Sequence, residues 1–253
     1  MPCLVDASEW CMQHCMGKNE DEECILYLEN PEEFSKHWEI KREGDNIIIG
    51  FDGASGGGKT TLVNQLAEIL EREGYDVGVV QEVVRGVFRE FKKKYGFNNL
   101  TELRASSRIA EFQQRCLVEQ YLQEELMMDE HDIVLSDRTL FGNEFFTLLY
   151  CKDSKALNEY FSKLEDYLNV RKLTHGKIYD AVVIVHPLPP EINVDDGFRS
   201  QDLHYREVQT FAIKQLARAY VDRMIELKTA DPWERINLIK PIIDFLVVEK
   251  LIH

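Results

Sequence analysis

The residues with the clearest chemistry lie in the glycine-rich segment 47–62, IIIGFDGASGGGKTTL. Gly53 is followed by four residues and then by Gly58-Lys59-Thr60, which fits the phosphate-loop pattern of nucleotide-binding proteins. A strand-like run precedes the match and a helix-like run follows it, as that pattern requires. The residues expected to bind the nucleotide are Gly53, Ser55, Gly56, Gly57, Gly58, Lys59, Thr60 and Thr61.

Each residue type in this loop has a distinct task. Glycines let successive backbone N–H groups turn inward around an anion, and the helix that follows points its positive end at the same place. Lys59 would reach the β and γ phosphates, and the Thr60 hydroxyl would ligate Mg²⁺. The alternative is a glycine-rich turn with a solvated lysine. We favour a nucleoside triphosphate site, with ATP or another triphosphate as donor and Mg²⁺ as its metal.

A carboxylate follows the second expected strand, in Gln81-Glu82-Val83-Val84-Arg85. In open parallel sheets ligands collect beyond the carboxyl ends of the strands, so Glu82 would face the γ phosphate. A base placed there can accept the proton of an attacking hydroxyl. The alternative is a solvated glutamate at a strand end. We predict that Glu82 is catalytic.

The third expected strand ends in Ser136-Asp137-Arg138. Asp137 would complete the Mg²⁺ site opposite Thr60, and Arg138 would offset charge on the transferred phosphoryl group. Asp-Arg pairs are common on protein surfaces, so the dipeptide alone would not indicate a site. The prediction depends on its position at the end of a strand.

After the fourth expected strand, Arg199 and Arg206 lie in or beyond a segment rich in proline and turn residues. A segment that carries arginines over a phosphate cleft can act as a lid, which excludes water and brings positive charge to the phosphoryl group. The alternative is an ordinary surface loop. Arg199 is the predicted lid arginine.

These residues require strands that end at one edge of a sheet. Continuous apolar runs at 47–49, 77–80, 133–135 and 181–185 predict buried parallel strands, and amphipathic stretches at 59–73, 102–130 and 154–172 predict helices between them. Gly74 supplies a helix stop. The segment 204–247 reads as mostly helical, interrupted at Asp231-Pro232 and Pro241, and no fifth strand is evident past residue 228. The expected fold is an α/β P-loop NTPase fold with a parallel sheet and helices on both faces.

Length and charge limit the architecture and the partners. The 253 residues fit one main domain, residues 46–253, and a short N-terminal extension, residues 1–45. The net charge is −15, and the extension holds 12 acidic against 4 basic side chains. This balance disfavours a broad nucleic-acid surface. No apolar stretch approaches the ~20 residues that cross a bilayer, and the N-terminus lacks the layout of a signal peptide, so we expect a cytoplasmic protein without a membrane partner.

The extension contains four of the six cysteines, Cys3, Cys11, Cys15 and Cys24, near His14. Their intervals match no common zinc pattern, so reduced thiols are favoured over a metal site. The role of the extension stays open. The sequence also leaves the oligomeric state open, a dimer included.

The motifs together resemble the ATP-dependent kinase domain of NadR type, which phosphorylates ribosylnicotinamide, and more widely the thymidylate and deoxynucleoside kinases. The resemblance covers about residues 45–228, and the segment 196–199, Asp-Gly-Phe-Arg, narrows it. It implies a P-loop kinase fold, ATP with Mg²⁺, and a small nucleoside-like acceptor. The resemblance implies that Lys59 and Thr60 bind the donor nucleotide and the metal. It also implies that Asp137 and Arg138 serve the metal and the phosphoryl group, and that Arg199 is an arginine of the lid. Relatives build part of the adenine pocket on a fifth strand, so the choice between ATP and GTP stays open.

The leading hypothesis is therefore an enzyme that transfers a phosphoryl group from a nucleoside triphosphate to a hydroxyl of a nucleoside- or nucleotide-like acceptor. A polynucleotide kinase is a second hypothesis, because the one basic run, residues 91–95, lies on the acceptor side. An ATP- or GTP-dependent switch protein is a third, in which Glu82 would orient water. The identity of the acceptor is not predicted.

Overall fold

The computed structural model describes residues 46–189, 191 and 202–252. The strands in this part of the chain are β1 (Ile47–Gly53), β2 (Val77–Val80), β3 (Ile133–Asp137), β4 (Ala181–Val185) and β5 (Met224–Leu227). The helices are α4 (Lys59–Arg72), α5 (Val84–Tyr95), α6 (Leu100–Arg104), α7 (Ile109–Glu130), α8 (Leu140–Tyr150), α9 (Ser154–His175), α10 (Leu203–Arg218) and α11 (Pro232–Ile252). Residues Phe161–Ile178 belong to a separate compact unit from the rest of the described chain.

The five strands form one parallel sheet in the order β2-β3-β1-β4-β5. Phe51 of β1 pairs with Asp137 of β3, and Gly53 pairs with Val185 of β4. The residues of β1, β3 and β4 are all buried, which explains their continuous apolar runs. The predicted α/β fold with a parallel sheet is confirmed.

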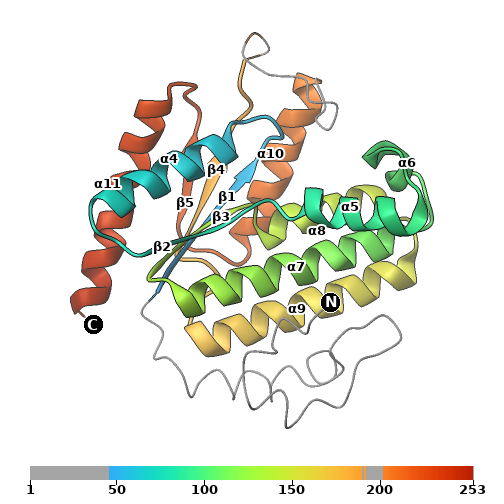
Figure 1. Ribbon diagram of the computed structural model, residues 1–253, viewed down its shortest axis with the longest axis horizontal. Coiled ribbons are helices and arrows are strands. Elements are labelled where there is room, and N and C mark those ends of the chain that lie inside the picture. Colours follow the sequence, from blue (N-terminus) through green and yellow to red (C-terminus); the bar gives the residue numbers. More distant parts are fainter. Residues whose placement is uncertain (1–45, 190, 192–201, 253) are drawn as a thin grey trace. The chain divides into compact units, whose positions relative to one another are not determined.

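Helices cover both faces of the sheet (Figure 1). On one face α4 and α11 pack together, and Leu66, Leu70, Ile239 and Ile243 lie in the core that they share with the strands. On the other face α8 contacts both α7 and α10, and α7 and α10 contact the strands. Strand β1 lies between β3 and β4, and the chain leaves β1 toward β2, so the strand order reverses at the carboxyl end of β1. Open parallel sheets bind their ligands at such a point.

The C-terminal part of the chain differs from the expectation that the segment 204–247 is mostly helical. Met224–Leu227 form β5, which pairs with β4 at the edge of the sheet, and no strand follows it in the described residues past 228. The interruption at Asp231-Pro232 is present, because α11 begins at Pro232 and Asp231 Oδ1 caps it through the N–H of Glu234 at 2.8 Å. Pro241, however, lies inside α11 rather than ending it.

Other helix bounds also differ from the expectation. The stretch 102–130 is divided into α6 and α7, and α5 and α8 were not predicted. The stop after α4 is where it was expected, with Gly74 at a φ of +92°. The extension 1–45, with its cysteines and His14, and the predicted lid around Arg199 lie outside the described residues.

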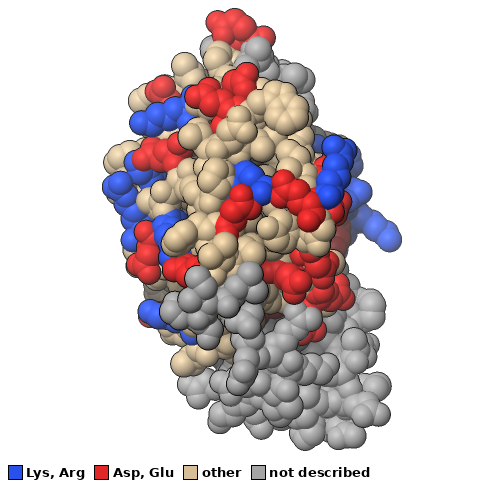
Figure 2. Space-filling model, turned by 90° about the vertical axis from the view of Figure 1, so that its left-hand side faces the viewer, with Lys and Arg blue, Asp and Glu red and all other residues tan. Residues whose placement is uncertain are grey.

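Charges on the described surface are mixed. On the face shown in Figure 2, acidic and basic side chains lie beside one another rather than gathering into one basic field. None of the described helices is both long and apolar enough to cross a bilayer.

Candidate active site

The phosphate loop passes from β1 to α4 through glycines in left-handed conformations. Their φ values are +113° at Gly53, +73° at Gly56 and +83° at Gly58, angles that side chains disfavour. A Cβ at Gly53 would stand 2.4 Å from the carbonyl oxygen of Val185 on β4. Glycine is therefore required where β1 runs beside β4 into the loop.

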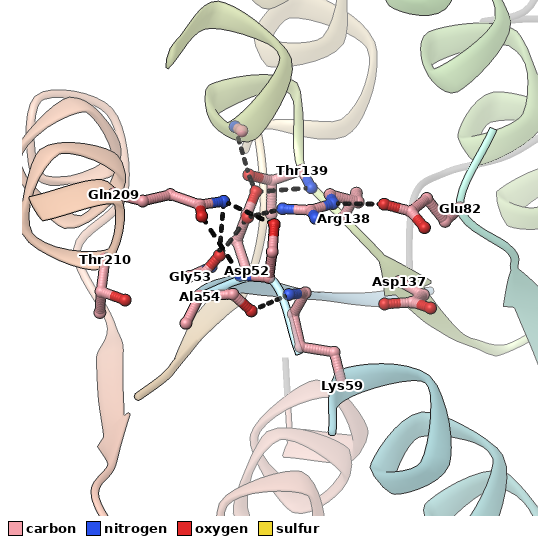
Figure 3. A network of polar contacts seen from close by, with 12 residues as sticks. Asp52, Gly53, Ala54, Lys59, Glu82, Asp137, Arg138, Thr139, Gln209 and Thr210 are labelled. Carbon is pink, nitrogen blue, oxygen red and sulfur yellow. Dashed lines mark hydrogen bonds and ion pairs between the residues drawn. The ribbon is translucent and has the colours of Figure 1, made fainter. Parts of the chain in front are cut away.

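Lys59, the first residue of α4, is buried with 6% of its surface exposed. Its Nζ donates to the carbonyl oxygen of Ala54 at 2.7 Å, so the side chain lies across its own loop (Figure 3). Burial, together with the neighbouring Arg138 guanidinium, lowers the pKa of Lys59 to about 8. An anion bound in the loop would stabilise the charged form of this lysine.

Thr60 and Asp137 meet across the end of the sheet. Thr60 Oγ1 donates to Asp137 Oδ2 at 2.5 Å. Burial raises the pKa of Asp137, although the nearby Lys59 opposes the shift. A hydroxyl and a carboxylate therefore place two hard oxygen ligands side by side, the donor type that Mg²⁺ prefers.

An ion-pair chain crosses the floor of the site from Asp52 through Arg138 to Glu82 (Figure 3). Arg138 donates from Nη1 to Asp52 Oδ1 at 3.2 Å and from Nε to Glu82 Oε1 at 2.9 Å. Asp52, which is fully buried, also accepts from the backbone N–H of Gly53 at 2.8 Å and from the N–H and hydroxyl of Thr139 at 3.0 and 2.6 Å. One carboxylate thus ties the start of the phosphate loop to Arg138.

Charge pairing sets the protonation states of Glu82 and Arg138. Burial alone would raise the pKa of Glu82, but the Arg138 guanidinium, Lys59 and Arg85 hold it below its usual value. Arg138 is buried as well, and Glu82 and Asp52 raise its pKa. Glu82 is therefore a carboxylate at neutral pH, and Arg138 is a cation.

The backbone of Arg138 is strained, with a φ of +124° in a residue other than glycine. Its carbonyl oxygen accepts from Ser136 Oγ at 2.8 Å and from Gln120 Nε2 at 3.4 Å. Both donors also bind the buried Glu124, whose Oε1 accepts from Ser136 Oγ at 2.6 Å, from Gln120 at 2.8 Å and from Tyr179 at 3.0 Å. This polar network holds Arg138 in a conformation that it would otherwise avoid.

Helix α10 braces the phosphate loop from the opposite side. Arg206, which is fully buried, donates to the carbonyl oxygens of Ser55 at 2.9 Å and Gly56 at 3.4 Å. Gln209 donates to the carbonyl oxygen of Gly53 at 3.2 Å and accepts from the N–H of Ser55 at 3.2 Å (Figure 3). Helix α10 thus holds three loop carbonyls and one loop N–H in place.

Helix α11 also braces the phosphate loop. Arg235, 4% exposed, donates from Nη1 to the carbonyl oxygen of Gly57 at 2.7 Å and from Nε to that of Thr229 at 2.7 Å. The loop after β5 is thereby joined to the phosphate loop.

One cavity of about 110 Å³ joins the phosphate loop to an apolar end. The apolar end is lined by Leu100, Arg104, Phe112, Gln113 and Phe146. Phe146 carries two guanidinium groups, Arg138 at 5.5 Å and Arg104 at 5.9 Å from the ring centroid. An aromatic pocket bounded by cations fits a planar, polar molecule.

Nearly all of the predicted site residues line this cavity. They are Ser55, Gly56, Gly57, Gly58, Lys59, Thr60, Thr61, Glu82, Asp137 and Arg138. Gly53 lies just before them in the loop, and Arg199 is outside the described residues. The sequence analysis missed Asp52, Gln113 and Gln209; only Asp52 carried a signal, as a carboxylate inside an apolar strand.

Comparisons with known proteins agree with this architecture. A model of the AAA domain family AAA_28 matches residues 48–235. A protein of Sulfurisphaera tokodaii (strain DSM 16993 / JCM 10545 / NBRC 100140 / 7), described as a probable thymidylate kinase, is 32% identical over 119 residues, which are 46% of this chain. The chain spans 57% of the length of that relative.

Two solved structures share the fold. The NadR protein in complex with NR has a TM-score of 0.55 and 21% identity, over 85% of this chain and 57% of that one. The NadR protein in complex with NAD and AMP-PNP has a TM-score of 0.50 and 18% identity, over 85% of this chain and 55% of that one. The expected resemblance to the NadR and thymidylate kinase group is confirmed. The chain belongs to the AAA_28 family of AAA domains, in which it carries a P-loop on a five-stranded parallel sheet.

Proposed function

We propose that this chain is a kinase that transfers the γ-phosphoryl group of ATP, or of another nucleoside triphosphate, to a hydroxyl of a nucleoside- or nucleotide-like acceptor. One observation carries the proposal: a single cavity holds the phosphate loop at one end, an aromatic pocket at the other, and Glu82 and Arg138 in its wall. A protein that only hydrolyses a triphosphate needs no such pocket beside its phosphate loop.

The donor phosphates would lie in the loop, with Lys59 turned from Ala54 onto the β and γ phosphates. The braces from α10 and α11 engage mainly the loop carbonyls, together with the N–H of Ser55, and so keep the shape of the loop. Preorganised donors of this kind cost little rearrangement when the charge on the phosphoryl group shifts.

Thr60 and Asp137 fit a Mg²⁺ ion, because they converge with hard oxygen atoms beside the loop. When bound, the ion would neutralise charge on the triphosphate. Burial raises the pKa of Asp137, and a cation bound beside it would stabilise the charged carboxylate.

Glu82 would accept a hydrogen bond from the acceptor hydroxyl and so aim its oxygen at the γ phosphorus. In the transfer the new bond forms between that oxygen and phosphorus, the bond to the β–γ bridging oxygen breaks, and the nucleoside diphosphate leaves. The hydroxyl proton passes to Glu82 and then to solvent. The Arg138 guanidinium holds the pKa of Glu82 below its usual value, so Glu82 is ionised and can accept this proton.

Arg138 would lie between the two reacting groups. It is bound to Glu82 and faces Phe146 of the acceptor pocket, and it is held there by Asp52 and the network around Glu124. A fixed guanidinium at this place would stabilise negative charge that spreads over the phosphoryl oxygens.

A panel of acceptors tests the proposal. Purified protein, ATP and Mg²⁺ are incubated with nucleosides, nucleoside monophosphates, ribosylnicotinamide and short oligonucleotides, and the products are weighed by mass spectrometry. We expect one small acceptor to gain a phosphoryl group with equal formation of ADP. Phosphorylation of oligonucleotides alone would support a polynucleotide kinase acting near the exposed Lys92, Lys93 and Lys94 of α5. Slow ADP release that no acceptor changes would support a switch protein.

A further inference from the structure

A single buried hydroxyl, that of Tyr179, joins the polar network around Glu124 to the start of helix α8. It lies 3.0 Å from each carboxylate oxygen of Glu124, to which it donates, and it accepts from the backbone N–H of Leu140 at 3.1 Å. Tyr179 is 4% exposed, and Glu124 and Leu140 are fully buried. Leu140 is the first residue of α8, so its N–H has no acceptor within the helix, and Tyr179 supplies one.

On one side, the hydroxyl reaches Arg138 through Glu124. Ser136 Oγ lies 2.6 Å from Glu124 Oε1 and 2.8 Å from the carbonyl oxygen of Arg138. Gln120 Nε2 lies 2.8 and 3.4 Å from the same two atoms. Among the described residues other than glycine, Arg138 alone has a positive φ, and such a conformation persists only where surrounding contacts hold it. A change at Glu124 therefore reaches the backbone of Arg138.

On the other side, the hydroxyl holds the helix that carries part of the acceptor pocket. Phe146 of α8 lines the apolar end of the cavity, and its ring centroid lies 5.5 Å from the Arg138 guanidinium. Phe141, in the first turn of α8, packs edge-on against the ring of Tyr179 with 5.7 Å between the centroids. The place of Phe146 relative to Arg138 therefore depends on how the start of α8 is held.

We infer that Tyr179 is a positioning residue for phosphoryl transfer, whose one hydroxyl keeps Arg138 and the acceptor-pocket helix α8 in a fixed relation. The inference rests on the proposed function and adds a residue outside the cavity, because Tyr179 is not among the described residues that line it. A phenol hydroxyl suits this place because it donates and accepts at the same time. Phenylalanine would keep the ring and do neither.

The size of the effect follows from the two hydrogen bonds. Tyr179→Phe leaves the N–H of Leu140 without this acceptor, and loss of a buried partner shifts an equilibrium by about 10- to 100-fold. Asp52 still binds Thr139, the residue between Arg138 and Leu140, so the turn stays formed. We therefore expect the lower end of this range, a fall in kcat of about tenfold, together with a higher KM for the acceptor. The Kd for ATP should not change, because α10 and α11 brace the phosphate loop.

A double-mutant cycle separates the positioning of Arg138 from general damage. With MgATP and the best acceptor of the panel, kcat, acceptor KM and the Kd for ATP are measured for the parent, Tyr179→Phe, Arg138→Lys and the double variant. Lysine keeps the charge of Arg138 but not its planar fork. Tyr179→Phe should lower kcat about tenfold in the parent and change it little in the Arg138→Lys background. Equal factors in both backgrounds, or an unchanged kcat in the parent, would overturn the inference while the kinase function stands.

Ser136→Ala tests the Glu124 side alone. It removes the hydroxyl beside the Arg138 carbonyl and leaves the hydrogen bond between Tyr179 and Leu140 in place. This variant should lower kcat and keep the acceptor KM of the parent. An unchanged kcat in Ser136→Ala would overturn the inference even if Tyr179→Phe failed to fold.

Tyr95→Phe is the matched control, because it also removes a hydroxyl that binds a glutamate of α7, Glu111 Oε1 at 2.6 Å, and Tyr95 is likewise absent from the cavity lining. Its kcat and acceptor KM should equal those of the parent. An equal fall in this control would show that the effect is not specific to Tyr179, and would overturn the inference. If the parent itself phosphorylates no acceptor under conditions in which ATP binds, the proposed function fails, and the inference fails with it.

Discussion

Replacing Asp52 by Asn should lower the free energy of unfolding more than any other Asp→Asn or Glu→Gln substitution in the site. The Asp52 carboxylate accepts four hydrogen bonds, from Gly53, Arg138 and twice from Thr139, and it is fully buried. The two Thr139 donors share Oδ2, whereas Gly53 and Arg138 share Oδ1. Asparagine keeps one of these oxygens, so its NH₂ must face one pair of donors.

The magnitude follows from that count. Each buried donor that loses its acceptor costs about 1–3 kcal/mol, so two donors cost about 2–6 kcal/mol. This is a large part of the 5–15 kcal/mol by which a domain is typically stable. With a urea dependence of about 2–3 kcal/mol per molar, the unfolding midpoint should fall by about 0.7–3 M.

The assay is urea unfolding of the nucleotide-free protein, followed by circular dichroism and tryptophan fluorescence. Asp231→Asn is the matched control, because Asp231 is an exposed N-cap of α11 and asparagine caps a helix equally well. Its midpoint should stay within experimental error of the parent protein. If Asp52→Asn also kept the parent midpoint, Asp52 would not be the residue that joins the phosphate loop to Arg138.

Three further substitutions probe the chemistry. Lys59→Met should abolish phosphoryl transfer yet raise the stability of the nucleotide-free protein by about 1–3 kcal/mol at pH 7, because burial lowers the pKa of Lys59 from 10.5 to about 8. Between pH 8 and 10.5 the unfolded chain holds a proton that the folded chain lacks, so the parent gains stability as the pH rises; a gap that stays constant in urea titrations from pH 7 to 10.5 would refute this. Asp137→Asn should raise the Mg²⁺ concentration needed for half-maximal transfer about tenfold or more, and an unchanged metal titration would remove Asp137 from the metal site. Glu82→Gln should lower kcat about 10²-fold or more with little change in ATP affinity, because Gln can still accept from Arg138 but cannot take a proton; Glu90→Gln, in helix α5 just after Glu82, is its control.

The sequence was sufficient where local pattern and tertiary structure agree. A strand buried on both faces is continuously apolar, so β1, β3 and β4 could be recognised without any partner. The phosphate loop could be recognised because its glycines serve local backbone angles that no other residue adopts easily. Glu82, Asp137 and Arg138 followed from the rule that parallel strands end at one edge.

Where contacts come from distant parts of the chain, the sequence was not sufficient. Only the last of the four residues of β5, MIEL, is fully buried, so this edge strand lacks the continuous apolar run that marks the other strands. Helix α8 is largely buried, which removes the one-sided pattern by which helices are recognised. Gln113 and Gln209 act through partners 30 and more than 150 positions away, and nothing near them in the chain signals those partners.

The central claim is that the γ-phosphoryl group passes to an acceptor hydroxyl rather than to water. A single-turnover experiment with γ-labelled ATP, excess protein, Mg²⁺ and a saturating acceptor measures where the label goes. We predict that most of the label appears in the phosphorylated acceptor, in step with ADP, and that Lys59→Met transfers none. Label that appears as inorganic phosphate at the same rate with and without every acceptor tested would contradict the claim, and would make the phosphate loop of this chain part of a hydrolase or a switch.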